Sequence, residues 1–182
     1  MIKKKIYFYI DNIQGLNLDY VKQTKASLIL RNKINNTFDG YEKFVNECKK
    51  RRINVYVSNN INLLFKLKTN RFYISAYNKK QYKWLKKTNN KIKIIGSAHN
   101  RKEILEKKEQ GCKKIILSRL FKTSKLGYLN TVKFNLIKLK INYKYIALGG
   151  IKETNFKKLK MVNCADFATM SELKKYPKYL KG

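Results

Sequence analysis

Two glycines end an apolar run near the carboxyl end of this chain and suit the binding of an anion. The run "YIALGGI" (145–151) stops at Gly149 and Gly150, and the helix-like segment "KETNFKKL" follows directly. Backbone N–H groups that are exposed beside a helix start are good partners for phosphate. The segment therefore predicts a place where a phosphate contacts bare backbone.

Hydroxyl groups and a lysine occur in two further segments of this kind. The segment "RLFKTSKLG" holds Thr123 and Lys125, and "DFATMS" ends in Met170 and Ser171. In many barrels the loops after the seventh and eighth strands build a phosphate site. We expect these residues to form such a phosphate-binding corner together with the two glycines.

Two cations follow another apolar run. In "LILRNK", Arg31 and Lys33 share one face of a strand because side chains alternate with a period of two. Two cations on one buried face are unfavourable unless an anion compensates their charge. We expect both to bind an anionic substrate; the alternative is that they lie beyond the strand end, in water.

The only histidine lies in "IIGSAHNRKEIL" (94–105). A single histidine excludes a metal site that needs two, and packing in a loop is a more ordinary role for His99 than general-base catalysis. Asn100 and Glu103 have the spacing of a helix N-cap and its third residue. Ser97, just before them, is a candidate for binding substrate.

These residues lie on elements that the hydrophobic pattern predicts. Eight short apolar runs predict eight β-strands, which begin at Ile6, Ser27, Ile53, Phe72, Ile92, Lys114, Tyr145 and Asp166. Between them, apolar residues recur at helical spacing, as in 41–50, 81–87, 101–110 and 155–162. Apolar strands alternating with helices predict a parallel sheet. We expect residues 1–182 to form one compact α/β domain, a (β/α)8 TIM barrel; a doubly wound open sheet is the alternative.

In either fold, ligands bind at the carboxyl ends of the strands, so the residues described above should meet at one edge. Three asparagines join them there. Asn59 and Asn60 follow the third strand, and Asn78 follows the fourth. The complete set is cationic and rich in hydroxyl and amide groups, which favours a phosphorylated substrate.

The composition is strongly basic, with 43 Lys plus Arg against 11 Asp plus Glu and a net charge of +32. Such a charge attracts polyanions, but 37 of the cations are lysines spread over nearly every helix-like segment. Solvated lysine faces are therefore the preferred interpretation, and a nucleic-acid partner is unlikely. The field would still concentrate phosphorylated substrates.

The three cysteines, Cys48, Cys112 and Cys164, are far apart and form no CxxC pair, so they indicate neither a disulfide framework nor a zinc site. The N-terminal apolar run is too short for a signal sequence or a membrane span. We expect a cytoplasmic protein without a membrane partner. No feature of the sequence indicates an oligomeric state.

The order of the segments resembles a known family. "IGSAHNRKEILEKKEQGCKKIILSRLFKTSK" and "YIALGGIKETNFKKLKMVNCADFATMSEL" are similar to the second half of thiamine phosphate synthase and of the TenI-type thiazole tautomerases. Those proteins share a Ser-x-His box, a Thr/Ser-Lys loop, a Gly-Gly-Ile strand end and a small-residue eighth strand. The likeness covers Lys91 to Leu173 well and the first half more loosely.

The resemblance implies an enzyme of thiamine biosynthesis that joins a pyrimidine pyrophosphate to a thiazole phosphate and releases pyrophosphate. Because the pyrimidine cation left behind is attacked by the thiazole nitrogen, the protein mainly neutralises leaving-group charge and aligns the substrates. By this resemblance Arg31 and Lys33 bind the pyrophosphate, and Ser97 and Lys125 also contact the pyrimidine substrate. Asn59 matches the family's substrate-site asparagine after the third strand. The thiazole phosphate would be held by Thr123, Gly150, Met170 and Ser171.

The chain also departs from the family. The synthases hold Mg²⁺ with two aspartates, and the matching positions here are Asn60 and Asn78. Neutral amides are poor substitutes for carboxylates around this cation. In addition, Arg119 occupies the position of a tautomerase histidine. The alternatives are therefore a TenI-like thiazole phosphate-binding relative, an inactive descendant, or a nonenzymatic polyanion-binding protein.

Overall fold

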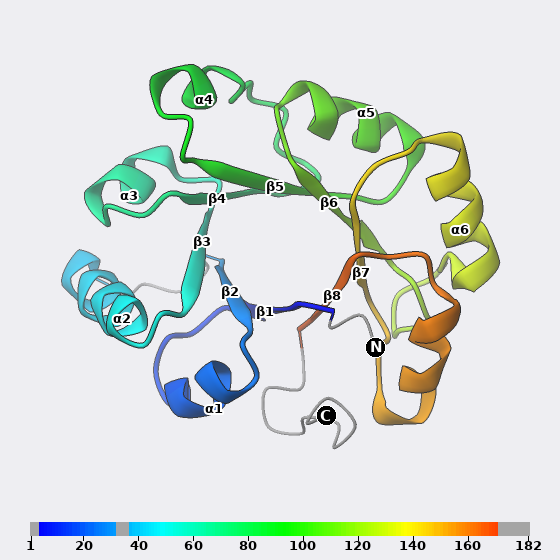
Figure 1. Ribbon diagram of the computed structural model, residues 1–182, viewed down its shortest axis with the longest axis horizontal. Helices are drawn as coiled ribbons and strands as arrows, with labels where there is room; N and C mark the ends of the chain where they lie inside the picture. Colours follow the sequence, from blue (N-terminus) through cyan, green and yellow to red (C-terminus); the bar gives the residue numbers. More distant parts are fainter. Residues whose placement is uncertain (1–3, 32–36, 171–182) are drawn as a thin grey trace.

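The computed structural model describes residues 4–31 and 37–170 of the chain. In it, eight parallel strands form a closed barrel in the order of the sequence, and β8 pairs with β1 (Figure 1). The predicted (β/α)8 barrel is confirmed, and the open-sheet alternative is wrong because the last strand closes onto the first. The strands are β1 (Ile6–Ile10), β2 (Ser27–Leu30), β3 (Asn54–Ser58), β4 (Arg71–Ile74), β5 (Lys93–Ala98), β6 (Lys114–Ser118), β7 (Tyr145–Leu148) and β8 (Asp166–Thr169).

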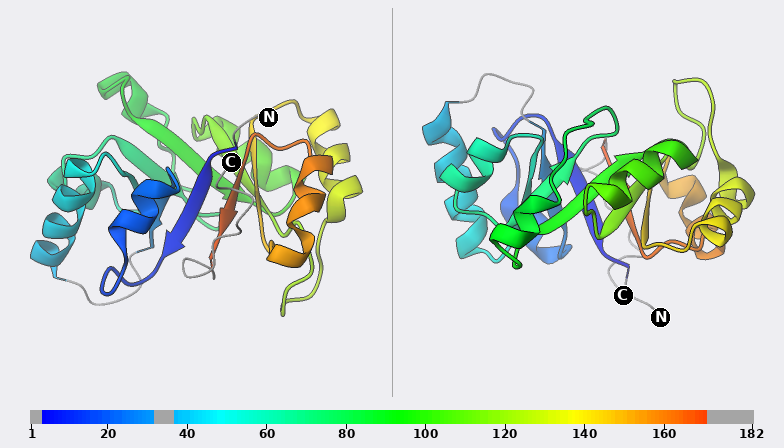
Figure 2. Two further views of the ribbon diagram at one scale, coloured as in Figure 1. Left: turned by 60° about the horizontal axis from the view of Figure 1, so that its bottom comes forward. Right: turned by 90° about the horizontal axis from the view of Figure 1, so that it is seen from above.

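Helices surround the barrel on its outside (Figures 1 and 2). They are α1 (Leu18–Gln23), α2 (Phe38–Lys50), α3 (Ile61–Lys66), α4 (Trp84–Thr88), α5 (Arg101–Glu109), α6 (Asn130–Lys140) and the 3₁₀ helix η1 (Glu153–Met161). Several have only 5 or 6 residues, which lets a short chain complete the barrel. The segment predicted as an α-helix over 155–162 is instead part of the 3₁₀ helix η1. The helix expected after β8 lies outside the described residues.

Asparagine side chains begin three of these helices. Asn17, Asn60 and Asn100 each accept a hydrogen bond at 2.9 Å from the backbone N–H three residues later. Such a bond satisfies one of the N–H groups that a helix leaves unpaired at its start. The predicted cap at Asn100 is therefore confirmed, and Asn60 has the same structural role in α3.

The core has two parts, because the strands are buried on both faces. One part lies between the barrel and the helices, and the other fills the barrel itself. Inside the barrel, four tyrosines occupy the side formed by β1, β3 and β4: Tyr7, Tyr9, Tyr56 and Tyr73. Their rings pack in pairs, with centroids 5.9 Å apart for Tyr7 and Tyr56 and 5.6 Å apart for Tyr9 and Tyr73. The interior is a packed core rather than a pore.

An ion pair lies at the amino-terminal end of the barrel. Asp166, the first residue of β8, accepts hydrogen bonds from Lys114 Nζ at 2.5 Å and from the backbone N–H of Lys5 at 3.0 Å. The carboxylate is buried, and both of its oxygens have a donor. The charge of Asp166 is therefore compensated within the protein, and the described polar residues that are predicted to bind substrate lie at the other end of the barrel.

All three cysteines are buried, and no disulfide joins them. Burial raises the pKa of the Cys48 thiol to about 12, so this thiol stays protonated and acts as a small apolar side chain. Among residues 4–31 and 37–170, no helix is both long and apolar enough to span a membrane.

Candidate active site

Arg31 and Asp11 form an ion pair at the carboxyl end of the barrel. Each is the first residue after its strand, β2 and β1. Arg31 Nε donates to Asp11 Oδ1 at 2.7 Å, and Nη2 donates to Oδ2 at 2.5 Å. The guanidinium also lies 5.3 Å from the centre of the Tyr9 ring. The anion that the sequence requires opposite Arg31 is thus supplied by the protein itself, and Lys33 lies outside the described residues.

A buried chain of hydroxyl groups runs from this pair toward Ser97. Tyr9 donates to the hydroxyl of Tyr73 at 3.1 Å, and the Tyr73 and Ser97 hydroxyls are 2.8 Å apart. Burial raises the pKa of Tyr9 well above its ordinary value and also raises that of Tyr73. Both phenols therefore stay protonated and serve as hydrogen-bond donors, not as bases. Through this chain the structure connects Arg31 and Ser97.

Four consecutive strands place a buried serine near their carboxyl ends: Ser58 on β3, Ser75 just after β4, Ser97 on β5 and Ser118 on β6. Serine is small and carries a hydroxyl, so these positions offer polar groups while leaving room above the apolar core. Of these four serines, only Ser97 was predicted to bind substrate. The period of two indicates the other three as well, because it puts all four on the inward face above Tyr56, Tyr73, Ile95 and Ile116.

Asn59, Ser75 and Asn78 form a second polar cluster. Asn59 adopts a left-handed backbone with φ 57°, and its Oδ1 accepts from Ser75 N and from Asn78 Nδ2, both at 3.0 Å. Its Nδ2 donates to the Ser75 hydroxyl at 2.9 Å. The two asparagines predicted after β3 and β4 are therefore in direct contact, and each fixes the other's orientation.

The amides do not fit a magnesium ion. The Oδ1 atoms of Asn59, Asn60 and Asn78 already accept backbone N–H groups, from Ser75, Leu63 and Lys80 respectively. None of the three carries the negative charge that this cation prefers. Within the described ranges, no group of three or more His, Cys, Asp or Glu residues could hold a metal. The donor set at these positions is that of a hydrogen-bonded structural cluster.

The loop after β7 contains the two predicted glycines in left-handed conformations, Gly149 with φ 103° and Gly150 with φ 65°. A Cβ on Gly150 would lie 2.5 Å from the carbonyl oxygen of Lys122 and 2.7 Å from that of Phe121. Glycine is therefore needed here because the loop after β6 packs directly against it. Phe121 N donates to the Gly149 carbonyl at 3.0 Å, which joins the two loops.

The loop between β6 and α6 extends away from the barrel (Figure 2). Arg119 closes its base, since its Nε donates to the Gly127 carbonyl at 3.0 Å and its Nη2 donates to the Leu126 carbonyl. Within the loop, Thr123 Oγ1 accepts from Lys125 N at 3.2 Å. The Lys125 side chain is exposed. Arg119 thus has a structural role, and a guanidinium held in this way is unsuited to acid–base chemistry.

His99 and Met170 complete the predicted positions. His99 Nδ1 lies 3.0 Å from Glu103 Oε2, and its backbone N donates to the same oxygen at 2.8 Å. The imidazole is half exposed and belongs to the start of α5, as expected for packing in a loop. Met170 is also half exposed, just after β8, and Ser171 lies outside the described residues.

At the carboxyl ends of the strands, the hydroxyl chain connects Arg31 with Ser97, and Asn59 contacts Asn78 in a separate cluster. Gly149 and Gly150 pack against the loop that carries Thr123 and Lys125. Against known families, the model described as thiamine monophosphate synthase matches residues 18–173. The chain belongs to this family. A search of curated proteins gives no sequence match.

Solved structures agree with this assignment at the level of the fold. Thiamine phosphate pyrophosphorylase from Pyrococcus furiosus matches with a TM-score of 0.72 and 16% identity, over 93% of this chain and 87% of that protein. An aldolase for 2-keto-3-deoxy-6-phosphogluconate from Zymomonas mobilis matches with a TM-score of 0.61 and 12% identity, over 97% and 86% of the two chains. At these identities the likeness concerns the barrel, which supports many chemistries. Membership of the thiamine monophosphate synthase family comes from the sequence match.

Proposed function

We propose that this protein is a thiamine phosphate synthase-like enzyme that joins a pyrimidine pyrophosphate to a thiazole phosphate and releases pyrophosphate. The observation that carries the proposal is the family match over residues 18–173, on a barrel whose carboxyl end holds Arg31 beside a chain of hydroxyl donors. Its partners would be these two small phosphorylated molecules.

The reaction requires the protein to neutralise the charge of the departing pyrophosphate and to align the two substrates. The bond between the pyrimidine methylene carbon and the pyrophosphate oxygen breaks, and the electron pair leaves with pyrophosphate. The thiazole nitrogen then donates its lone pair to that carbon, which forms the new C–N bond. No protein nucleophile takes part, so fixed cations and hydrogen-bond donors supply the catalysis.

The described residues suit these roles. Arg31 presents a guanidinium that can exchange its internal carboxylate, Asp11, for the pyrophosphate. Ser97 and Tyr73 provide protonated hydroxyls, and Asn59 with Asn78 provides amides of fixed orientation. By family likeness we assign Lys33 and Lys125 to the pyrophosphate, and Thr123, Gly150, Met170 and Ser171 to the thiazole phosphate.

A steady-state assay with both phosphorylated precursors, with and without Mg²⁺, tests the proposal. The amides at the two expected metal positions predict that any activity depends weakly on this ion. Thiamine phosphate formation above background, lost on Arg31→Ala, supports a synthase. If the product forms no faster than in enzyme-free controls, with Mg²⁺ present and ~1 mM of each precursor, at the top of the usual KM range, the synthase assignment is wrong.

A second candidate is a thiazole phosphate-binding relative without synthase activity. It is favoured by the Asp11–Arg31 pair, because the cation that would grip pyrophosphate is already compensated. Binding measurements separate the two. A synthase binds both precursors, whereas the relative binds the thiazole phosphate and leaves the pyrimidine pyrophosphate free.

A further inference from the structure

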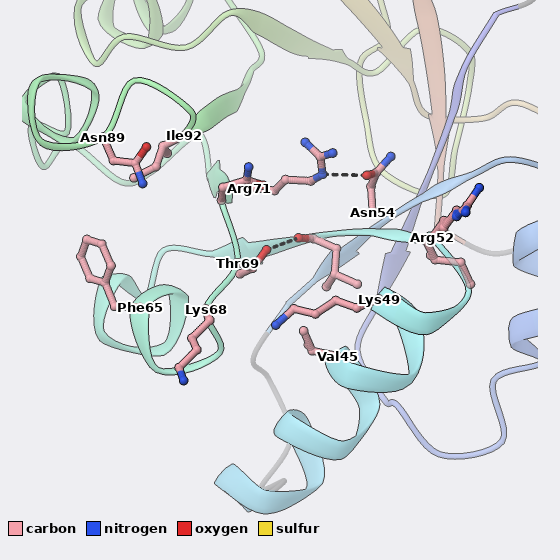
Figure 3. Close-up of a pocket in the computed structure, with 13 residues that line it drawn as sticks. Val45, Lys49, Arg52, Asn54, Phe65, Lys68, Thr69, Arg71, Asn89 and Ile92 are labelled. Carbon is pink, nitrogen blue, oxygen red and sulfur yellow. Dashed lines mark hydrogen bonds between the residues drawn. The ribbon is translucent and has the colours of Figure 1, made fainter.

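A pocket lies at the opposite end of the barrel from the candidate active site. It has a volume of about 580 Å³, which is in the range of small-molecule sites. Its walls come from the amino-terminal ends of β3, β4 and β5 and from the carboxyl-terminal ends of α2 and α3 (Figure 3). Nothing in the proposed synthase reaction uses it.

The charged residues that line this pocket are all cations: Lys49, Arg52, Lys68 and Arg71. They come from α2, from the turns after α2 and α3, and from the start of β4. No carboxylate lines the pocket. Because these four positive charges repel one another, a multiply charged anion bound between them would lower the free energy of the folded protein.

The nearby carboxylates are paired elsewhere. Arg51, which does not line the pocket, forms ion pairs with both Asp19 and Glu47. Lys49 Nζ instead donates to the Leu67 carbonyl at 2.9 Å, and this bond offsets the partial negative charge at the end of α3.

The other three cations keep donors available. Arg71 Nε donates to Asn54 Oδ1 at 2.8 Å, and its guanidinium lies 5.9 Å from the centre of the Tyr56 ring. The side chains of Arg52 and Lys68 are exposed and form no ion pair with the described part of the chain. None of the four lining cations therefore has a carboxylate partner there, and an anion would meet uncompensated charge.

An aromatic ring lies at one side of the pocket. Phe65 on α3 is 45% exposed, and Figure 3 places it on the same side as Asn89 and Ile92, with Arg52 and Asn54 on the other side. An exposed ring is a stacking surface for a planar heterocycle. Asparagine amides beside it offer both donors and acceptors to the edges of such a ring.

We propose that this pocket is a second ligand site that binds a nucleoside polyphosphate, with the base against Phe65 and the phosphates among Arg52, Lys68 and Arg71. Both parts of such a ligand have partners here: four cations without a carboxylate partner among the described residues, an exposed ring with asparagine amides, and a volume suited to a small molecule. A volume of about 580 Å³ has room for one small molecule, which favours a nucleotide over a nucleic-acid strand.

The backbone provides a well-matched experiment. Arg52 and Lys68 occupy left-handed conformations after their helices, with φ 59° and 47°, and Lys25 after α1 does the same with φ 52°. Glycine suits this conformation best, so replacing any of these cations by glycine removes a charge without straining the fold. Lys25 does not line the pocket. Lys25→Gly is therefore the control, because it removes a positive charge from the same backbone conformation at a position outside the pocket.

The test measures binding of metal-free ATP and of tripolyphosphate by calorimetry to the full chain, at ~50 and ~200 mM salt because charge-driven binding weakens with salt. We expect ATP to bind more tightly than tripolyphosphate to the wild type. The double variant Arg52→Gly/Lys68→Gly should weaken ATP binding about tenfold or more, as expected when charge-assisted hydrogen bonds are lost. Lys25→Gly should leave it within about twofold, and Phe65→Ala should remove the preference for ATP.

Circular dichroism and thermal unfolding establish that each variant is folded. Equal weakening by Lys25→Gly would overturn the proposal in favour of diffuse attraction to a basic surface. So would ATP binding that is lost on Arg31→Ala, which would place the nucleotide at the other end of the barrel. Tighter binding of a single-stranded oligonucleotide, unaffected by the double variant, would also reject it.

Discussion

The proposed reaction requires pyrophosphate to displace Asp11 from Arg31. A bidentate carboxylate satisfies a guanidinium as a phosphate does, so substrate must compete with Asp11 for Arg31. Asp11→Asn keeps the shape of this side chain but removes its charge. We predict that it strengthens pyrophosphate binding, whereas Arg31→Ala weakens it by about tenfold, the equivalent of one charge-assisted hydrogen bond.

Titration calorimetry with pyrophosphate checks this prediction, and Asp19→Asn is its control. Asp19 is also a carboxylate paired with an arginine, Arg51, but it belongs to α1 and not to the barrel mouth. Its loss changes net charge equally and should leave the affinity unchanged. Stronger binding to both aspartate variants would mean that net charge, and not release of Arg31, controls the affinity.

The hydroxyl chain from Tyr9 through Tyr73 to Ser97 makes a second residue-scale prediction. Ser97→Ala leaves the buried Tyr73 hydroxyl with one partner of its two, and an unsatisfied buried donor costs about 1–3 kcal/mol. We expect this loss in the free energy of unfolding, measured by urea denaturation. The double variant Ser97→Ala/Tyr73→Phe should cost less than the sum of the single variants, because they remove one shared bond.

Ser58→Ala is the matched substitution for that experiment. Ser58 is buried to a similar degree at the end of β3, but its hydroxyl has no hydrogen bond within the described residues. Its replacement should change stability by less than about 0.5 kcal/mol. If Ser58→Ala lowered the free energy of unfolding as much as Ser97→Ala, the loss would come from removing any buried serine and not from the bond to Tyr73.

At the scale of elements, the contact between the loops after β6 and β7 depends on Gly150. An added Cβ would overlap two backbone carbonyl oxygens in a left-handed conformation. Backbone cannot move away as a side chain can, so we predict that Gly150→Ala lowers the free energy of unfolding by more than about 2 kcal/mol. Gly15 has a similar φ of 69° with nothing within 4 Å of an added Cβ. Gly15→Ala should therefore cost only about 1 kcal/mol, which separates the overlap from the conformational strain.

The start of α5 gives a prediction about pH. Partial burial disfavours the charged form of Glu103, but hydrogen bonds from His99 and Asn100 outweigh it and lower the pKa of this carboxyl. A carboxylate whose pKa is lower in the folded chain stabilises the fold above its ordinary pKa and loses this effect as pH falls through the lower value. Glu103→Gln should cost about 1 kcal/mol at pH 7 and clearly less near pH 3, because the stabilisation declines once pH falls below the ordinary range of this pKa.

Urea denaturation at both pH values measures this difference, with Glu42→Gln as the control. Glu42 is exposed on α2, so its replacement should have little effect at either pH. A cost for Glu103→Gln that persists at low pH would attribute the loss to packing and not to the charged hydrogen bonds.

Most elements could be predicted because the strands are apolar on both faces and alternate with helical spacing. The turns after α1, α2 and α3 could not, since Lys25, Arg52 and Lys68 stand where glycine would have signalled a left-handed residue. In the candidate site, Arg31 and Ser97 could be predicted as substrate-binding residues because they lie at the ends of strands. Their partners Asp11 and Tyr73 depend on which side chains meet across the barrel, and Tyr73 appears in the sequence only as part of an apolar strand.

For the molecule as a whole, the governing property is the excess of positive charge. The 11 acidic residues face 43 Lys and Arg, and many of those acids are already engaged in ion pairs or caps. Most lysines therefore have no carboxylate to compensate them. The resulting field attracts anions, and it also makes the folded chain repel itself.

This self-repulsion predicts that salt stabilises the protein. The Debye length falls from about 30 Å at 0.01 M to about 3 Å at 1 M, so repulsion across the molecule is screened while short ion pairs are less affected. Between ~0.01 and ~0.5 M NaCl we expect a gain of about 2 kcal/mol, or roughly 4–8 °C in Tm for a chain of this size. Lys157→Glu, an exposed change on η1 away from both sites, should raise Tm at low salt and have a smaller effect at high salt. A Tm that falls with added NaCl would mean that the few attractive pairs, and not the excess of lysine, dominate the electrostatics of the fold.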